Sequence, residues 1–290
     1  MLPTVGSAMP RLVLVSAPAG FGKTTLLSQW LATGAEPAAH VAWLSLDQGD
    51  NDPGQFLAHL VAALRATDLD AVAPTTGLLE TGGEMSTEAV PVSPVNDLDL
   101  VVGATVLALD DYHVIDEIGV HEAVAFLVEH LPPRTTLAMA TRADPPLPLA
   151  RLRAQAELVE VRASDLRFTA AEADAFLDRV MGLDISADQV AALDARTVGW
   201  AAGLQLAALS LRGQDQPAGF VEAFTGSHRI VLDYLGKDVL GRLSEDVREF
   251  LLATSVLDRL TGQLREHRRH LDGGYPRTQW LGQGRPGTQP

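Results

Sequence analysis

The stretch Leu12-Val-Leu-Val-Ser-Ala-Pro-Ala-Gly-Phe-Gly-Lys-Thr-Thr25 decides the fold of this chain. It begins with an apolar run, continues into a loop with two glycines, and leads into leucines at helical spacing. A strand, a glycine-containing loop and a helix in this order are typical of a phosphate-binding loop. The full pattern has glycine where Ala17 stands, and alanine can replace it if its φ is negative. The alternative interpretation is a glycine-rich loop before an ordinary helix.

This loop predicts a nucleotide site. Its backbone turns successive N–H groups inward, and the positive end of the following helix adds to the anion site. Lys23 can reach the β- and γ-phosphates, and the Thr24 hydroxyl is placed to ligate Mg²⁺. We therefore expect ATP or ADP with Mg²⁺ as cofactors. The nucleotide-binding residues expected in this loop are Ala19, Gly20, Phe21, Gly22, Lys23, Thr24 and Thr25.

The composition argues against several classes of protein. The 290 residues are 47% hydrophobic and 20% charged, which is ordinary for a globular protein, and the length allows two domains. No apolar run approaches the ~18 residues of a membrane span, and the N-terminus lacks the pattern of a signal peptide. The net charge of −15 repels a nucleic-acid backbone. We therefore expect a chain that binds neither a membrane nor, by itself, DNA. The absence of cysteine favours a cytoplasmic location.

Strand-like and helix-like patterns alternate through the first half, which predicts an α/β fold with a parallel sheet. The strands expected after the first are 41–46, 105–109, 135–141 and 158–161. Residues 67–96 have the composition of a long loop. After residue 165 only helical patterns remain, so we expect a domain boundary there. Two of these helices begin with capping-box signatures, Thr169 with Glu172 and Ser186 with Gln189.

Two acids follow the third expected strand. At the carboxyl end of a strand beside the phosphate loop, Asp110 can hold Mg²⁺, and Asp111 can orient and deprotonate the attacking water. The alternative is a pair of solvated turn carboxylates. Arg142 ends the next strand, at the same edge of a parallel sheet. It either senses the γ-phosphate or forms a surface ion pair with Asp144 or Asp165, and the sequence favours neither.

In combination these motifs resemble the STAND class of signal-transduction NTPases. Within that class the chain is most similar to the MalT-like regulators, the large ATP-binding members of the LuxR group. The resemblance covers about residues 10–260, and that family tolerates alanine at the position of Ala17. The stretches that carry the resemblance are Ala17–Thr25, Trp43–Asp47, Asp50–Pro53, Leu109–His113, Ala140–Pro146, Asp165–Thr169, Gly199–Leu206, Gly226–Arg229 and Leu232–Leu235.

The resemblance implies a division into domains. Residues 1–165 are expected to form a P-loop nucleotide-binding domain, with the sheet order of P-loop ATPases that carry an added strand. Residues 166–212 correspond to an all-α lid, and residues 213–260 to a winged-helix-like domain. Residues 261–290 match nothing in the family and are poor in aliphatic side chains, so we expect a disordered or aberrant tail.

The resemblance also implies a function. Gly203, Leu204 and Gln205 match the lid motif that packs near the adenine, and Arg142 matches the phosphate sensor. Such proteins are slow switches: ADP holds them closed, and an inducer or regulatory protein with ATP opens them into homo-oligomers. The family's helical-repeat sensor and its DNA-binding helix-turn-helix have no counterpart in the sequence, so we expect a truncated regulator. The alternatives are a P-loop kinase or other metabolic phosphotransferase, and a non-enzymatic fragment.

Overall fold

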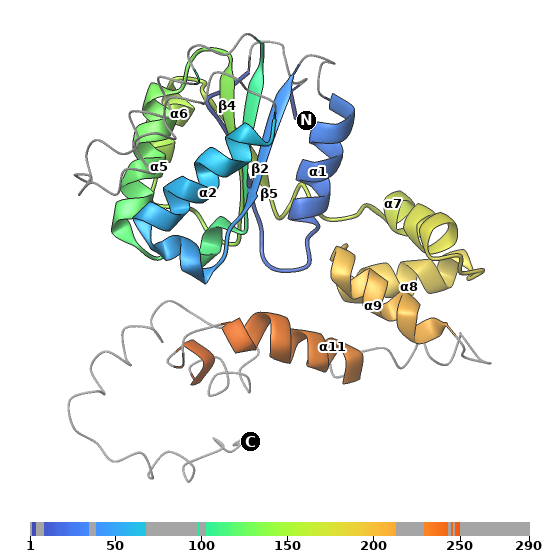
Figure 1. Cartoon of the computed structure of the whole chain (residues 1–290). Coiled ribbons are helices and arrows are strands. Elements are labelled where there is room, and N and C mark those ends of the chain that lie inside the picture. The colour runs from blue at the N-terminus through green and yellow to red at the C-terminus, as the bar shows by residue number, and fades with distance from the viewer. Residues whose placement is uncertain are drawn as a thin grey trace, which may run out of the picture. The chain divides into compact units, whose positions relative to one another are not determined.

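A parallel sheet forms the centre of the first half of the chain (Figure 1). The computed structural model describes residues 2–3, 9–34, 39–67, 98, 103–212, 229–242, 245 and 247–249. Within this part the strands are β1 (Leu12–Ser16), β2 (His40–Ser45), β3 (Thr105–Asp110), β4 (Thr135–Thr141) and β5 (Leu158–Arg162). Their order is β2-β3-β4-β1-β5, and all four neighbouring pairs are parallel. The predicted α/β class and parallel sheet are confirmed, and all carboxyl ends lie at one edge.

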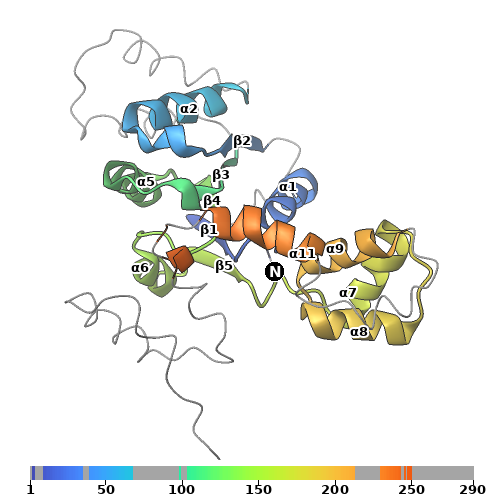
Figure 2. The same cartoon turned by 90° about the horizontal axis from the view of Figure 1, so that it is seen from below.

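Helices cover both faces of the sheet (Figure 2). The helices of the sheet region are α1 (Lys23–Gly34), α2 (Pro53–Arg65), α5 (Ile118–His130) and α6 (Leu149–Ala154). Side chains alternate along a strand, so Leu12 and Leu14 point to the face covered by α2, α5 and α6. Val13 and Val15 point to the opposite face, where α1 packs. Burial on both faces explains why β1 reads as an unbroken apolar run.

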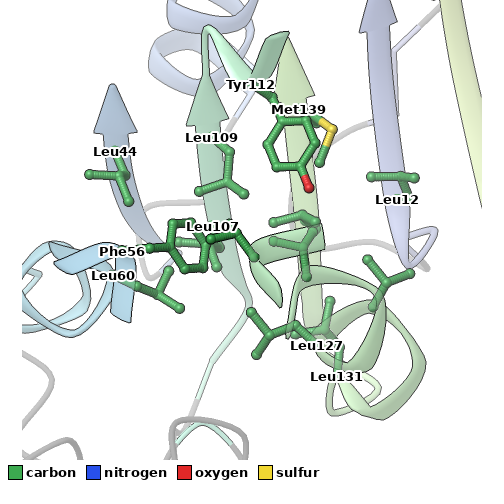
Figure 3. Close-up of a cluster of buried hydrophobic side chains, with 14 of the residues drawn as sticks. Leu12, Leu44, Phe56, Leu60, Leu107, Leu109, Tyr112, Leu127, Leu131 and Met139 are labelled. Carbon is green, nitrogen blue, oxygen red and sulfur yellow. The ribbon is translucent and has the colours of Figure 1, made fainter. Parts of the chain in front are cut away.

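A large cluster of buried side chains lies between the sheet, α2 and α5 (Figure 3). Phe56 and Leu60 of α2 and Leu127 of α5 pack with Leu107 and Leu109 of β3, and all five side chains are fully buried. Burying each such side chain contributes about 1.5–3 kcal/mol. This packing fixes β3, which ends at the two acids nominated from the sequence.

The second half of the described chain is helical. Its helices are α7 (Ala170–Ala175), extended by a π-helical turn (Phe176–Val180), α8 (Ala187–Thr197) and α9 (Ala201–Leu211). Both predicted capping boxes are present: the side chains of Thr169 and Ser186 accept hydrogen bonds from the backbone N–H groups of Glu172 and Gln189. We refer to residues 166–212 as the helical subdomain.

Contacts within the chain divide it into two compact units, Met1–Asp233 and Tyr234–Pro290. The first unit contains both the sheet and the helical subdomain. Helix α11 (Arg229–Tyr234) continues as a π-helical turn (Leu235–Val239) and a 3-10 turn (Leu240–Arg242). The expected loop after Thr67, most of the expected winged-helix-like domain and the expected tail lie outside the described residues. No helix in the described part of the chain is long and apolar enough to span a bilayer.

Candidate functional site

The loop between β1 and α1 has the backbone of a phosphate-binding loop. Gly20 and Gly22 have φ values of 76° and 79°, in the region that glycine adopts readily. A Cβ on Gly22 would meet no atom within 4 Å, so the space beside this residue is open. Ala17 is buried and is not among the described residues with positive φ. Alanine is therefore compatible with the first position, as the sequence predicted.

Lys23 begins α1 and is directed back onto the loop. Its side chain is buried, and its ammonium group donates a hydrogen bond of 3.1 Å to the carbonyl oxygen of Pro18. Burial, followed by the positive charge of Arg142, lowers the pKa of Lys23 below its ordinary value of 10.5. Asp111 and Asp110 act in the opposite direction on this pKa. Lys23 is thus a buried cation next to three other charged groups at one sheet edge.

Asp110 ends β3 next to the start of α1. Its Oδ1 accepts a hydrogen bond of 3.1 Å from the hydroxyl of Thr24 and one of 2.9 Å from the backbone N–H of Asp111. The carboxyl is buried, and this burial raises its pKa above the ordinary 3.8. The structure thus brings together the hydroxyl and the carboxylate nominated as Mg²⁺ ligands. Oxygen donors of this kind are what Mg²⁺ requires, so the two residues fit the ion.

Asp111 and Arg142 follow β3 and β4 at the same edge. Asp111 has φ 56° and ψ 33°, a left-handed conformation that aspartate tolerates better than most residues. Its side chain is 45% exposed and lies 3.6 Å from Nδ1 of His113. A carboxylate held in a strained turn and open to solvent is able to orient a water molecule. Arg142 is half-buried and close enough to Lys23 to lower the pKa of that lysine.

The two acids considered as alternative partners of Arg142 both contact Arg162. Asp144 forms an ion pair with the Arg162 guanidinium and accepts a 3.3 Å hydrogen bond from the Ser16 hydroxyl. Asp165 accepts a hydrogen bond of 2.8 Å from the backbone N–H of Arg162. These contacts tie the end of β5 to the end of β1.

Three contacts join the helical subdomain to the phosphate-binding loop. The indole N–H of Trp200 donates to the carbonyl oxygen of Ala19 at 3.1 Å, and the backbone N–H of Ala202 donates to that of Gly20 at 3.0 Å. The Arg167 guanidinium lies 5.9 Å from the centre of the Phe21 ring. Trp200, Ala202 and Arg167 were not among the site residues predicted from the sequence. The sequence signal for them was their place in two stretches that carry the family resemblance, Asp165–Thr169 and Gly199–Leu206.

Gly203, Leu204 and Gln205 lie near the start of α9. Gly203 is buried, and a Cβ there would approach Trp200 to 2.6 Å and Thr197 to 3.1 Å. Leu204 is fully buried, whereas Gln205 is exposed. Gly203 therefore makes room for the ring of Trp200. The predicted contact of these three residues with an adenine stays a prediction.

Comparison with known proteins finds relatives that are much longer than this chain. It is 34% identical over 280 residues to the HTH-type transcriptional regulator MalT of Yersinia enterocolitica, covering 95% of this chain and 30% of that protein. MalT of Cronobacter sakazakii is 35% identical over 256 residues, covering 87% and 28%. The serine/threonine-protein kinase PknK of Mycobacterium tuberculosis is 34% identical over 254 residues, covering 88% and 23%. The chain thus spans less than a third of the length of these relatives.

The MalT winged helix domain family matches residues 236–274. We expected similarity to the family to end near Thr261, and this expectation is wrong because the match continues beyond it. The composition of residues 261–290 had suggested a tail, but low aliphatic content does not exclude family membership.

The fold has a counterpart among solved structures. The Walker-type ATPase of Pyrococcus abyssi aligns with a TM-score of 0.55 at 14% sequence identity, covering 92% of this chain and 81% of that one. At this level of identity the similarity concerns the fold alone. The predicted P-loop NTPase fold is therefore confirmed.

Proposed function

From the similarity of this chain to the MalT-type regulators, we propose that it is a nucleotide-dependent switch module of a regulator of this type. In this proposal the module binds ATP or ADP with Mg²⁺ and hydrolyses ATP slowly. The observation that carries this proposal is the 3.1 Å hydrogen bond between the Thr24 hydroxyl and Asp110, beside the buried ammonium group of Lys23. A P-loop NTPase holds Mg²⁺ with a hydroxyl and an acid in these two roles and holds the phosphates with the lysine.

In this proposal each charged residue has a defined task. Lys23 leaves the Pro18 carbonyl oxygen and binds the β- and γ-phosphates, where its charge is favoured. Thr24 and Asp110 hold Mg²⁺, which neutralises phosphate charge when it is bound. Asp111 orients and deprotonates the attacking water. Arg142 reaches the γ-phosphate from the end of β4, so ATP and ADP differ in their contacts with this strand.

The proposed output is a change in the arrangement of domains. A ligand shifts a conformational equilibrium only by the difference between its affinities for the two states. The γ-phosphate contacts at Arg142 supply such a difference, and they favour an open form that assembles into a homo-oligomer in the presence of an inducer. In a regulator of this type, we propose that DNA is bound by a C-terminal helix-turn-helix domain and not by the segment described above. We place this activity in the cytoplasm.

The similarity to PknK favours a second candidate. The same segment is shared by proteins named as a transcriptional regulator and as a protein kinase, and it makes up 23–30% of each. A shared segment of this kind supports a common regulatory module attached to different effectors. The second candidate is therefore a nucleotide switch that controls a kinase domain.

Turnover measurements test the proposal. A P-loop kinase turns over at ~1–100 s⁻¹, whereas we expect the purified chain to hydrolyse Mg-ATP far more slowly and to bind it in a stable complex. We expect Asp111→Asn to bind ATP with unchanged affinity and to hydrolyse it at least about 10-fold more slowly, because a general base contributes about 10²–10⁴-fold. Phosphoryl transfer to a small-molecule acceptor at kinase rates would contradict the switch function.

A further inference from the structure

Three successive carbonyl oxygens of the phosphate-binding loop accept hydrogen bonds. Pro18, Ala19 and Gly20 each accept one hydrogen bond, of 3.1, 3.1 and 3.0 Å. The first donor is Lys23 of the same loop, and the other two are Trp200 and Ala202 of the helical subdomain. A segment about 180 positions later in the sequence therefore holds two successive peptide groups of the loop.

This engagement has a consequence for the anion site. In a planar trans peptide the C=O and the following N–H point in opposite directions. When the carbonyl oxygens of Ala19 and Gly20 face α9, the N–H groups of Gly20 and Phe21 face away from it. N–H groups in these positions are the donors of a phosphate-binding loop. The helical subdomain thus fixes the orientation of two anion-binding groups.

The contact also completes helix α9. The first N–H groups of a helix have no partner within the helix, and a side chain normally caps them. Trp200 occupies the N-cap position of α9, and its side chain makes no capping hydrogen bond. The carbonyl oxygen of Gly20 accepts from the N–H of Ala202 instead. Separating the subdomain from the loop therefore costs α9 a capping interaction.

Three local features place the Trp200 ring. Val198 and Gly199 have φ values of 52° and 69°, so the chain turns sharply between α8 and α9. The Gly199 carbonyl oxygen accepts a 2.9 Å hydrogen bond from the N–H of Phe168, and a Cβ on Gly199 would come within 2.5 Å of the Phe168 carbonyl oxygen. Gly203 leaves the space that the ring of Trp200 occupies.

We propose that Trp200 is a positioning residue for the nucleotide site, which holds the phosphate-binding loop through the Ala19 carbonyl and lets the helical subdomain set the rate of nucleotide release. This inference rests on the proposed nucleotide binding. Movement of the subdomain withdraws the Trp200 and Ala202 donors together, so the loop loses its fixed orientation and the phosphates lose theirs.

The test compares two tryptophan substitutions in the full chain. Trp200→Phe removes the N–H donor and keeps most of the ring, and we expect a fluorescent ADP analogue to dissociate about 2- to 10-fold faster, the effect of one net hydrogen bond. Trp43→Phe is the matched control, because its indole N–H bonds Ser45 Oγ on the same strand at 2.9 Å and not the loop. We expect its dissociation rate to equal that of the unmodified chain.

A second readout needs no substitution. Amide hydrogen exchange of residues 199–206 is expected to change when Mg-ADP binds, while exchange at 187–197 stays constant. Equal dissociation rates for Trp200→Phe and Trp43→Phe would overturn the inference, as would unchanged exchange at 199–206 despite bound ADP. If the unmodified chain binds no ADP analogue, the proposed function itself fails. If it binds and Trp200→Phe releases at the same rate, only the role of Trp200 fails.

Discussion

At the scale of single residues, Lys23 and Asp110 are opposite charges that folding removes from water at one sheet edge. Desolvation disfavours the charged form of each group, so it lowers the pKa of Lys23 and raises that of Asp110. Phosphate and Mg²⁺ favour the charged forms of these two residues respectively. Burial of these two charges is therefore a cost to the stability of the ligand-free chain, and the proposed magnesium nucleotide would relieve it.

The lowered pKa of Lys23 predicts a pH dependence of ADP binding. Phosphate binds the ammonium form, so affinity falls as the pH rises through the pKa of Lys23 in the free chain, which lies below 10.5. Binding above that pKa takes up a proton, measurable by calorimetry in buffers with different ionisation enthalpies. Lys23→Arg stays charged, so we expect weaker binding without this pH dependence. An affinity that stays constant up to pH 10.5 would contradict the argument.

The raised pKa of Asp110 predicts a stabilising substitution. A carboxyl whose native pKa is raised stabilises the fold below its unfolded pKa, and this stability is lost as the pH rises through the native pKa. At neutral pH the carboxylate is therefore unfavourable, and Asp110→Asn keeps an acceptor for the Thr24 hydroxyl. We expect a melting temperature about 2–4 °C higher per kcal/mol gained, together with lost dependence of ATP binding on Mg²⁺.

The control for Asp110→Asn is the neighbouring Asp111→Asn. The Asp111 side chain is 45% exposed, so neutralising it relieves little desolvation. We expect its melting temperature in the absence of nucleotide to stay within about 1 °C of the unmodified chain. A decrease in the stability of ligand-free Asp110→Asn would show that the carboxylate is stabilising, contrary to our account.

At the scale of elements, the sharp turn between α8 and α9 is strained. Val198 has φ 52°, and a β-branched side chain in this region is a genuine outlier. The residue is 59% exposed, so buried packing does not explain its presence. The turn directs Trp200 to the phosphate-binding loop, and backbone strain of this kind is common at functional sites.

Relieving this strain is expected to stabilise the chain. Asparagine adopts the left-handed region more easily than valine, so Val198→Asn is expected to raise the free energy of unfolding by about 0.5–1 kcal/mol. Urea denaturation measures the change. Val180→Asn is the matched control, because Val180 is 67% exposed but lies in a helical turn without a positive φ. Equal effects of the two substitutions would mean that the turn carries no strain.

The sequence predicted elements more fully than it predicted their contacts. The apolar runs, the glycines of the loop and the capping residues are local sequence features. The strands, the phosphate-binding loop and the capping boxes that they predicted are all present. Asp110 and Thr24 could be paired in advance because parallel strands end at one edge. The contact of Trp200 with Ala19 joins residues 181 positions apart, and no local pattern encodes it.

At the scale of the whole molecule, the acidity of this chain opposes binding to nucleic acid. A net charge of −15 opposes the release of counterions that drives binding to DNA. We expect no binding of a labelled DNA duplex to the chain at physiological salt, with or without ATP, as measured by fluorescence anisotropy. Binding with a steep salt dependence would reveal a basic surface that the total charge conceals.

The length of chain that the proposed nucleotide switch needs is a second question at this scale. The family match at residues 236–274 means that a chain cut after Leu260 would lose part of the matched winged helix domain. Composition alone suggested that the similarity to the family ends earlier. Composition indicates how much apolar surface a segment can bury, but it does not indicate to which family the segment is similar. Experiments on the proposed switch therefore need a chain that extends at least to residue 274.

Calorimetry with Mg-ADP and Mg-ATP on the full chain tests the central claim most directly. We predict binding with a dissociation constant in the micromolar range or tighter, about −8 kcal/mol or more favourable. We also predict that Lys23→Ala loses it, while Lys237→Ala, the substitution of the one other lysine in the sequence, keeps it. Absence of binding in a folded, nucleotide-free sample, or unchanged affinity in Lys23→Ala, would contradict the account.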